Sequence, residues 1–264
     1  MFRPMIKAPK DPPMEGDSVS FGFRDVDPDL HGGLVREIFD SVAGRYDLMN
    51  DLMSGGLHRF WKAALIDWLN PKPGEILIDV AGGTGDIAFR FLERAGAAGD
   101  SAAAAICDIN EQMLKIGTDR ALDRGLVSGL SVICGDAQAL PIASNSADAC
   151  TIAFGLRNVT HRQRALAEMR RILRPGGHFL CLEFSHPVVA LLKPLYDLYS
   201  FKVLPVLGAR VTGDEDAYRY LVESIRAFPD QDTLLGDLGD AGFGNISYRN
   251  YSGGIVAIHS GWRI

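Results

Sequence analysis

Apolar residues before position 70 recur with the period of an α-helix. From Leu57 onward they fall at i, i+3, i+4, i+7, i+8, i+11 and i+12, which places them on one face of a helix. These positions are Leu57, Phe60, Trp61, Ala64, Leu65, Trp68 and Leu69. Pro71, Pro73 and Gly74 follow and indicate where that helix ends. We predict a helical segment over residues 33–70.

Beyond residue 70 the pattern changes to short apolar runs that alternate with helical segments. The runs occupy residues 76–80, 103–107, 130–134, 147–153 and 178–184. Apolar runs of this length, bounded by turns, predict parallel strands buried on both faces, with helices between them. Residues 245–262 differ, because two runs flank a Ser252-Gly253-Gly254 turn. This pattern predicts a C-terminal antiparallel hairpin in an otherwise α/β fold.

The length of 264 residues suits one large α/β domain, and two small domains are the less favoured alternative. We expect a mobile N-terminal tail over residues 1–32, which mixes prolines with both charge signs. A single domain is expected over residues 33–264. Within it, residues 33–70 are expected to form a helical lid, and residues 186–230 a helical insertion on the substrate side.

Charge and cysteine content exclude several classes of protein. A formal charge of -6 argues against nucleic acid as a partner, because phosphate binding normally accompanies a basic surplus. The 4 cysteines form no CxxC pair and the 6 histidines show no ligand spacing, so we expect no metal. No secretory signal is recognisable, and the apolar stretch 188–209 is interrupted by Lys193, Asp197 and Lys202. We therefore expect a cytoplasmic protein.

A glycine-rich loop follows the first apolar run. Gly83, Gly85 and Ala88 match the G-x-G-x-x-A pattern, in which glycines let a ligand approach the backbone closely. The pattern alone fits NAD, FAD and S-adenosylmethionine equally. Asp86 favours the last, because a carboxylate at the start of this helix opposes a pyrophosphate but attracts a sulfonium or ammonium group. Asp79 adds a second carboxylate, and the alternative for Asp86 is a simple helix cap.

Two further acids follow the next two predicted strands. Asp108 lies immediately after the second run, where an acid accepts hydrogen bonds from ribose hydroxyls in nucleotide-binding sheets. Asp136 follows the third run and is placed to meet an adenine amino group. Because the carboxyl ends of parallel strands share one edge of the sheet, these acids predict a single ligand crevice there.

Narrower motifs identify a family. The stretches RYDLMND (45–51), FGLRNV (154–159) and ESIRAFPDQ (223–231) accompany DVAGGTGD (79–86). With them, the sequence resembles the ubiquinone/menaquinone biosynthesis C-methyltransferase family along nearly the whole chain after the tail. The resemblance implies a Rossmann-like seven-stranded methyltransferase sheet with one antiparallel strand. It also implies S-adenosyl-L-methionine as cofactor and a polyprenylated benzoquinol or naphthoquinol as substrate, methylated on a ring carbon.

The resemblance extends to cofactor positions, which fall on Thr84, Asp108, Asp136 and Ala137. With the loop residues, the expected cofactor site comprises Asp79, Gly83, Thr84, Gly85, Asp108, Asp136 and Ala137. One departure is Ala153, where family members carry a serine. The hydroxyl contact of that serine is lost here, and we expect a small change in cofactor affinity.

The expected chemistry centres on the FGLRNV motif. A quinol ring carbon becomes strongly nucleophilic when a neighbouring hydroxyl ionises, and a nearby cation lowers the pKa of a hydroxyl by about 1–3 units. Arg157 is our candidate for that cation, with surface ion pairing as the alternative. Asn158 is expected to hold a water or a quinol oxygen. Tyr46 is expected to close the site over the ring, with core packing as the alternative.

Partners and competing functions follow from the same residues. The aromatic stretch 191–207 is a candidate wall for the prenyl tail, with ordinary core packing as the alternative. Because the substrate resides in membrane, we expect peripheral contact with the inner membrane or with other quinone-biosynthesis enzymes. A homodimer is left open. The competing functions are an NAD(P)-dependent oxidoreductase and a non-catalytic scaffold of a quinone-synthesis complex.

Overall fold

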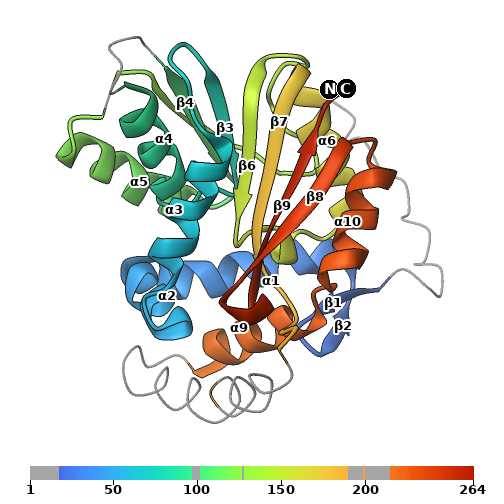
Figure 1. Cartoon of the computed structure of the whole chain (residues 1–264). Helices are drawn as coiled ribbons and strands as arrows, with labels where there is room; N and C mark the ends of the chain where they lie inside the picture. Colours follow the sequence, from blue (N-terminus) through green and yellow to red (C-terminus); the bar gives the residue numbers. More distant parts are fainter. Residues whose placement is uncertain (1–17, 97–101, 127, 190–198, 200–214) are drawn as a thin grey trace, which may run out of the picture.

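The computed structural model describes residues 18–96, 102–126, 128–189, 199 and 215–264. Seven strands form one sheet in the order β5-β4-β3-β6-β7-β9-β8 (Figure 1). They are β3 (Ile76–Val80), β4 (Ala103–Asp108), β5 (Leu130–Cys134), β6 (Ala147–Ala153), β7 (Leu173–Phe184), β8 (Gly244–Tyr251) and β9 (Val256–Trp262). Strands β3 to β7 pair in parallel, and β9 is antiparallel to both of its neighbours. The predicted α/β sheet and C-terminal hairpin are confirmed.

Helices cover both faces of this sheet, as the continuous apolar runs predicted. They are α3 (His58–Leu69), α4 (Asp86–Gly96) and α5 (Glu111–Asp123) on one face, and α6 (Arg162–Ile172) and α10 (Gln231–Asp240) on the other (Figure 1). Side chains of β7 alternate between the two cores: Leu180 and Leu182 join the first, whereas Phe179 and Cys181 join the second.

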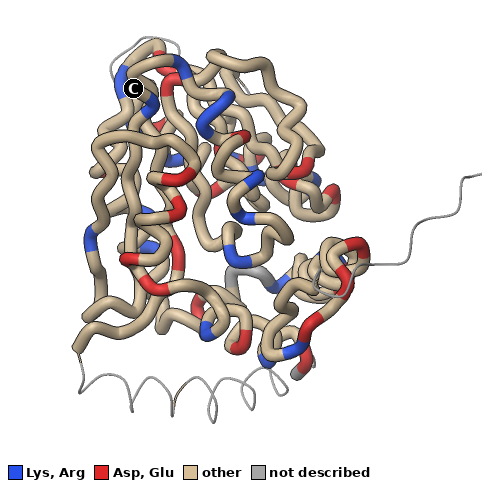
Figure 2. Tube along the Cα trace, turned by 90° about the vertical axis from the view of Figure 1, so that its right-hand side faces the viewer, with Lys and Arg blue, Asp and Glu red and all other residues tan. Residues whose placement is uncertain are grey.

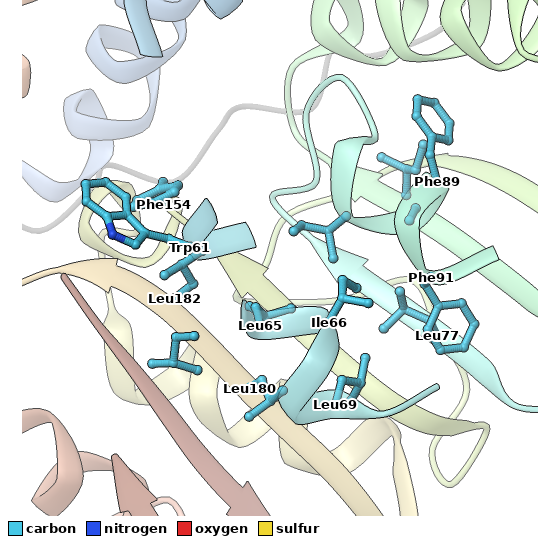
Figure 3. Close-up of a cluster of buried hydrophobic side chains, with 14 of the residues drawn as sticks. Trp61, Leu65, Ile66, Leu69, Leu77, Phe89, Phe91, Phe154, Leu180 and Leu182 are labelled. Carbon is cyan, nitrogen blue, oxygen red and sulfur yellow. The ribbon is translucent and has the colours of Figure 1, made fainter. Parts of the chain in front are cut away.

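The predicted apolar face of α3 packs on the sheet. Trp61 and Leu65 are buried there beside Leu182 of β7 (Figure 3). The Trp61 indole Nε1 donates a hydrogen bond to Ser252 Oγ at 3.0 Å, which anchors the helix to the turn between β8 and β9. Phe60, which the periodicity also placed on this face, remains 59% exposed. The stripe is therefore buried only from Trp61 onward.

The prediction of a mobile tail over residues 1–32 is wrong from residue 18 onward, where the chain is folded. Strands β1 (Val19–Phe21) and β2 (Arg24–Val26) form an antiparallel hairpin, and α1 (Pro28–Val42) follows at once. The Asp27 side chain caps this helix by accepting a hydrogen bond from Asp29 N at 2.8 Å. Phe21 stacks on Tyr220 with ring centroids 4.3 Å apart, so the hairpin depends on a distant helix.

Several elements gather at the end of the sheet where the parallel strands terminate. The helical segment predicted over 33–70 consists of α1, η1 (Ala43–Arg45), α2 (Tyr46–Ser54) and α3. Helices α1 and α2, the β1–β2 hairpin and α9 (Glu215–Ala227) lie together below the sheet in Figure 1. Of the predicted insertion, residues 190–198 and 200–214 lie outside the described residues, as does most of the candidate prenyl wall.

Acidic and basic residues are interspersed along the described part of the trace (Figure 2). Within the described residues, no helix has the length and apolar content that spanning a bilayer requires. The same residues hold no group of three or more His, Cys, Asp or Glu suited to a metal ion.

Candidate active site

A cleft of about 820 Å³, part of it open to solvent, lies at the carboxyl ends of the parallel strands. Its walls come from the loops that follow β3, β4, β5 and β6, and from α1 on the open side. The strand order changes direction between β3 and β6, and ligands bind at such switch points in open α/β sheets. The cleft therefore lies at the edge of the sheet where Asp108 and Asp136 predicted it.

The glycines of the loop after β3 have different tasks. Gly83 lines the cleft with φ +53°, and its N–H donates to Asp108 Oδ2 at 2.8 Å. A Cβ on Gly85 would lie 2.6 Å from Ile106 Cδ1, so this residue allows α4 to pack closely on the sheet. Gly83 thus serves the ligand side of the loop, whereas Gly85 serves packing.

The Asp108 carboxylate is fixed at the wall of the cleft. Besides Gly83 N, it accepts a hydrogen bond from Asn110 N at 2.9 Å. Burial raises its pKa, and the backbone N–H groups oppose that effect. Asn110 in turn caps α5 by accepting from Met113 N at 3.0 Å. A carboxylate has about four acceptor positions, so Asp108 can accept further hydrogen bonds from a ligand.

Asp136 and Ala137 also line the cleft, after β5. Asp136 Oδ1 accepts a hydrogen bond from Gln138 N at 2.8 Å and from Gln138 Nε2 at 3.1 Å. Gln138 lines the cleft as well, and its Oε1 accepts from His161 N at 2.9 Å. Gln138 was missed from the sequence, because a glutamine in a turn carries no signal of its own.

Asp79 and Thr84 lie behind the loop and do not line the cleft. Asp79 is 1% exposed, and its Oδ1 accepts a hydrogen bond from Thr151 Oγ1 at 2.7 Å. Its Oδ2 has no hydrogen-bond partner among the described residues, and burial raises its pKa to about 7. Thr84 Oγ1 accepts from Arg120 Nη1 at 3.1 Å. Both side chains support the loop from beneath.

Asp86 begins α4, as the sequence predicted, but its charge is already balanced. Its Oδ2 lies 3.0 Å from Lys62 Nζ, and its Oδ1 lies 3.0 Å from Arg90 Nε. Burial opposes its ionisation, yet Lys62 and Arg90 lower its pKa to about 2. Asp86 does not line the cleft, so it neither repels an anion there nor attracts a cation strongly.

The structure does not bring Arg157 to the cleft. Its Nη1 forms a 2.9 Å ion pair with Glu183 Oε1 at the end of β7, and the two side chains are 4% and 1% exposed. Nη1 also donates to the Phe154 carbonyl oxygen. Burial raises the pKa of Glu183, whereas the Arg157 charge opposes that effect. Arg157 lines a second cavity, between the β1–β2 hairpin and α9.

The next residue, Asn158, does line the cleft. Its Oδ1 accepts a hydrogen bond from Tyr220 OH of α9 at 3.0 Å. Burial raises the pKa of Tyr220 to about 12, so this hydroxyl remains a donor at neutral pH. Tyr46 begins α2, and its side chain lies outside the described residues.

Helix α1 supplies cleft residues that the sequence did not single out. Gly32, Val35, Arg36 and Phe39 all line the cleft. Their spacing at i, i+3, i+4 and i+7 places them on one helical face, which is the signal that could have identified them.

Solved structures that share this fold include S-adenosylmethionine-dependent methyltransferases. A SAM-dependent methyltransferase from Thermotoga maritima aligns with a TM-score of 0.60 at 19% identity, over 87% of this chain and 100% of that one. One from Aquifex aeolicus aligns with a TM-score of 0.59 at 15% identity, over 83% and 98%. Identities this low show a shared fold and not a shared function. The cyclase SpnF, for example, has the same fold with a TM-score of 0.62.

The sequence comparisons are more specific. The ubiE/COQ5 methyltransferase family matches residues 19–263. The chain is 54% identical to the ubiquinone/menaquinone biosynthesis C-methyltransferase UbiE of Paracoccus denitrificans, over 96% of this chain and 99% of that protein. It is 52% identical to the UbiE protein of Acidiphilium cryptum, over 94% and 98%. The chain belongs to the ubiE/COQ5 methyltransferase family.

Proposed function

We propose that this methyltransferase transfers a methyl group from S-adenosyl-L-methionine to a ring carbon of a polyprenylated benzoquinol, naphthoquinol or both, in ubiquinone/menaquinone biosynthesis. The observation that carries this proposal is the 54% identity to a quinone-biosynthesis C-methyltransferase over 96% of the chain. The cleft at the switch point of the sheet supports it.

The residues of the cleft fit the cofactor. Gly83 leaves room beside the backbone, and the fixed Asp108 carboxylate suits the two ribose hydroxyls. Asp136 and Ala137 suit the adenine, since they follow the next strand outward. When bound, S-adenosyl-L-methionine supplies a methyl group on a positively charged sulfur. Asp79, Thr84 and Gly85 then hold the loop without touching the ligand.

On the substrate side, Asn158 is the residue placed to meet a quinol oxygen. Because its Oδ1 accepts from Tyr220, its amide N–H₂ group is the part able to donate toward the cleft. A donor there stabilises the developing phenolate, and such a donor is typically worth about 2.7–4 kcal/mol. Tyr46 retains its proposed role of closing the site over the ring.

Arg157 acts in this proposal as a positioning residue. Its bonds to Glu183 and to the Phe154 carbonyl oxygen fix the loop that carries Asn158. Direct stabilisation of a phenolate, the role expected from the sequence, requires a guanidinium that reaches the cleft. The positioning role therefore accounts better for its burial.

The prenyl tail gives the proposal its cellular setting. A substrate with such a tail resides in membrane, because keeping each of its CH₂ groups out of water is worth about 0.8 kcal/mol. We place the enzyme in the cytoplasm, in peripheral contact with the inner membrane or with other quinone-biosynthesis enzymes, and include a homodimer in the proposal.

Methyl transfer to a defined quinol tests the function. The purified chain is supplied with a short-tailed methoxy-benzoquinol and methyl-labelled S-adenosyl-L-methionine, and the product is mapped by mass spectrometry and NMR. We expect label on a ring carbon, and none when the oxidised quinone replaces the quinol. Label on oxygen alone would contradict the assignment. Binding of both ligands without transfer would indicate a non-catalytic scaffold, and reduction of the quinone by NADH an oxidoreductase.

A further inference from the structure

Helix α1 crosses the open side of the cleft and is fastened near both ends. Near its start, His31 Nδ1 lies 2.9 Å from Thr160 Oγ1, in the segment after β6. Near its end, Asp40 Oδ1 accepts a hydrogen bond from Asn110 Nδ2 at 2.8 Å, after β4. Strand β3 lies between β4 and β6 in the sheet. The middle of α1 therefore passes across the glycine loop that follows β3.

Arg36 occupies this middle position. It lines the cleft together with Gly83 of the glycine loop. Of the described residues that line the cleft, Arg36 alone has a cationic side chain. It is exposed and forms no salt bridge with a carboxylate in the described part of the chain. An exposed guanidinium that faces a ligand site is suited to bind a carboxylate through two parallel hydrogen bonds.

The order of the strands orients the ligand beneath Arg36. If the adenine lies at Asp136 after β5 and the ribose at Asp108 after β4, the amino-acid end extends toward β3. That end carries a carboxylate. The neighbouring charged groups of the cleft are Asp108 and Asp136, both acidic, so a carboxylate needs a compensating cation. The cations beneath the loop already have partners: Lys62 is paired with Asp86, and Arg120 donates to Thr84 Oγ1.

We propose that Arg36 binds the carboxylate of the methionyl group of the cofactor, an inference that rests on the proposed function. The contact joins the ligand to α1, which the His31–Thr160 and Asp40–Asn110 contacts hold over the cleft. Binding of the complete cofactor thus stabilises α1 in its position over the cleft. Ligands that lack this carboxylate lose the contact.

Calorimetric titration with two ligands tests the proposal. S-adenosyl-L-methionine is compared with its decarboxylated analogue, which retains the adenosine, the sulfonium and the amino group. Arg36→Ala should weaken affinity for the complete cofactor about 10- to 100-fold, as expected for a lost charge-assisted contact. Affinity for the decarboxylated analogue should change less than about threefold. Arg36→Lys should recover part of the loss, because it restores charge without the planar fork.

Arg164→Ala is the matched control, since Arg164 is exposed on α6 and does not line the cleft. It should leave both affinities unchanged. Equal losses of affinity for the two ligands in Arg36→Ala would overturn the proposal. Arg36 would then only help to hold α1 over the cleft. A raised KM for the quinol with unchanged cofactor affinity would also overturn it. Failure of the unaltered protein to bind either ligand would instead contradict the proposed function.

Discussion

The two halves of the cleft are built in different ways. In the half that we propose for the cofactor, formed by the loops after β3, β4 and β5 and called the cofactor half below, acids are held by backbone N–H groups of the same or the adjacent loop. Asp108 accepts from Gly83 N and Asn110 N, and Asp136 from Gln138 N. In the half that we propose for the substrate, called the substrate half below, the loop after β6 and α1 form the wall, α9 supports the loop, and side chains hold one another across the fold.

The substrate half depends on long-range partners. Asn158 pairs with Tyr220, 62 residues away in sequence, and Thr160 lies against His31, 129 residues away. Backbone N–H groups at strand ends are provided by the fold itself, so an acid there can be fixed without a dedicated partner. A polar side chain beside a mobile substrate needs a second side chain to orient it. We therefore expect substitutions elsewhere in the chain to disturb the substrate half more than the cofactor half.

The largest expected effect comes from the buried ion pair beneath the substrate half. Arg157→Met leaves Glu183 without its cation at 1% exposure, and breaking such a pair typically costs about 3–5 kcal/mol of stability. The double variant Arg157→Met/Glu183→Leu should regain much of that stability, because no charge remains buried. Urea unfolding measures both changes.

Activity of the same double variant separates two roles of Arg157. If Arg157 only positions Asn158, the double variant should lower kcat for the quinol with cofactor affinity intact, and adding Asn158→Ala to it should lower kcat no further. A further loss on adding Asn158→Ala would contradict the positioning role. That outcome would restore direct stabilisation of the phenolate.

The second prediction concerns Asp79, the acid of the cofactor half that does not line the cleft. Its pKa is raised by burial from 3.8 to about 7, so the folded state binds the proton more tightly than the unfolded state. The contribution of protonated Asp79 to the free energy of unfolding is fully present below pH 3.8. It is lost as pH rises from there through 7, by about 4 kcal/mol in total. Asp79→Asn should therefore unfold at higher urea concentration than the unaltered protein at pH 8.

The advantage of Asp79→Asn should shrink steadily as pH is lowered toward 4, and the exposed Asp119→Asn is the control for the substitution itself. Cofactor affinity of Asp79→Asn should change less than about threefold, because the side chain does not line the cleft. A large loss of affinity would show that Asp79 reaches the ligand after all.

Much of the fold was predictable because the central strands of the sheet are buried on both faces. The apolar runs matched the buried strands β3 and β6 at both ends. They also matched the edge strand β5, which is only partly buried. The β1–β2 hairpin was not predictable, since its three-residue strands carry little pattern of their own. Phe23 N in its turn donates to Glu223 Oε2 at 3.2 Å, 200 residues away, and no local signal reports such a contact.

The candidate site divides along the same line. Asp108 and Asp136 were predictable, since a residue at the end of a parallel strand lies at the crevice whatever its partners are. Arg157 also follows a strand, but its side chain turns toward Glu183 of the neighbouring strand end. The position of Arg157 in the sequence was enough to predict where its backbone lies. The direction of its guanidinium depends on the buried Glu183, which no local sequence pattern indicates.

The third prediction tests the cofactor half directly. Asp108→Ala should weaken S-adenosyl-L-methionine binding, because each charge-assisted hydrogen bond to a ribose hydroxyl is worth about 1.5–3 kcal/mol. Calorimetric titration against the exposed control Asp119→Ala measures the change. Equal affinities would mean that the ribose lies elsewhere in the cleft.

The smallest expected effect is also the most selective. Tyr220→Phe removes only the hydroxyl that donates to Asn158 Oδ1, while the ring that stacks on Phe21 remains. One neutral hydrogen bond is worth about 1 kcal/mol, so kcat/KM for the quinol should fall about fivefold, with cofactor affinity unchanged. Tyr248→Phe is the matched control, because its hydroxyl donates to Asp232 at an exposed site.

A double-variant cycle then decides whether the Tyr220 hydroxyl acts through Asn158. If it does, Asn158→Ala should lower kcat/KM further than Tyr220→Phe, and the combined variant should be no slower than Asn158→Ala alone. Fully additive losses would mean that Tyr220 affects the quinol independently. In that case Tyr220 and Asn158 would each act on the quinol separately. The pairing of side chains that characterises the substrate half would then not apply to Asn158.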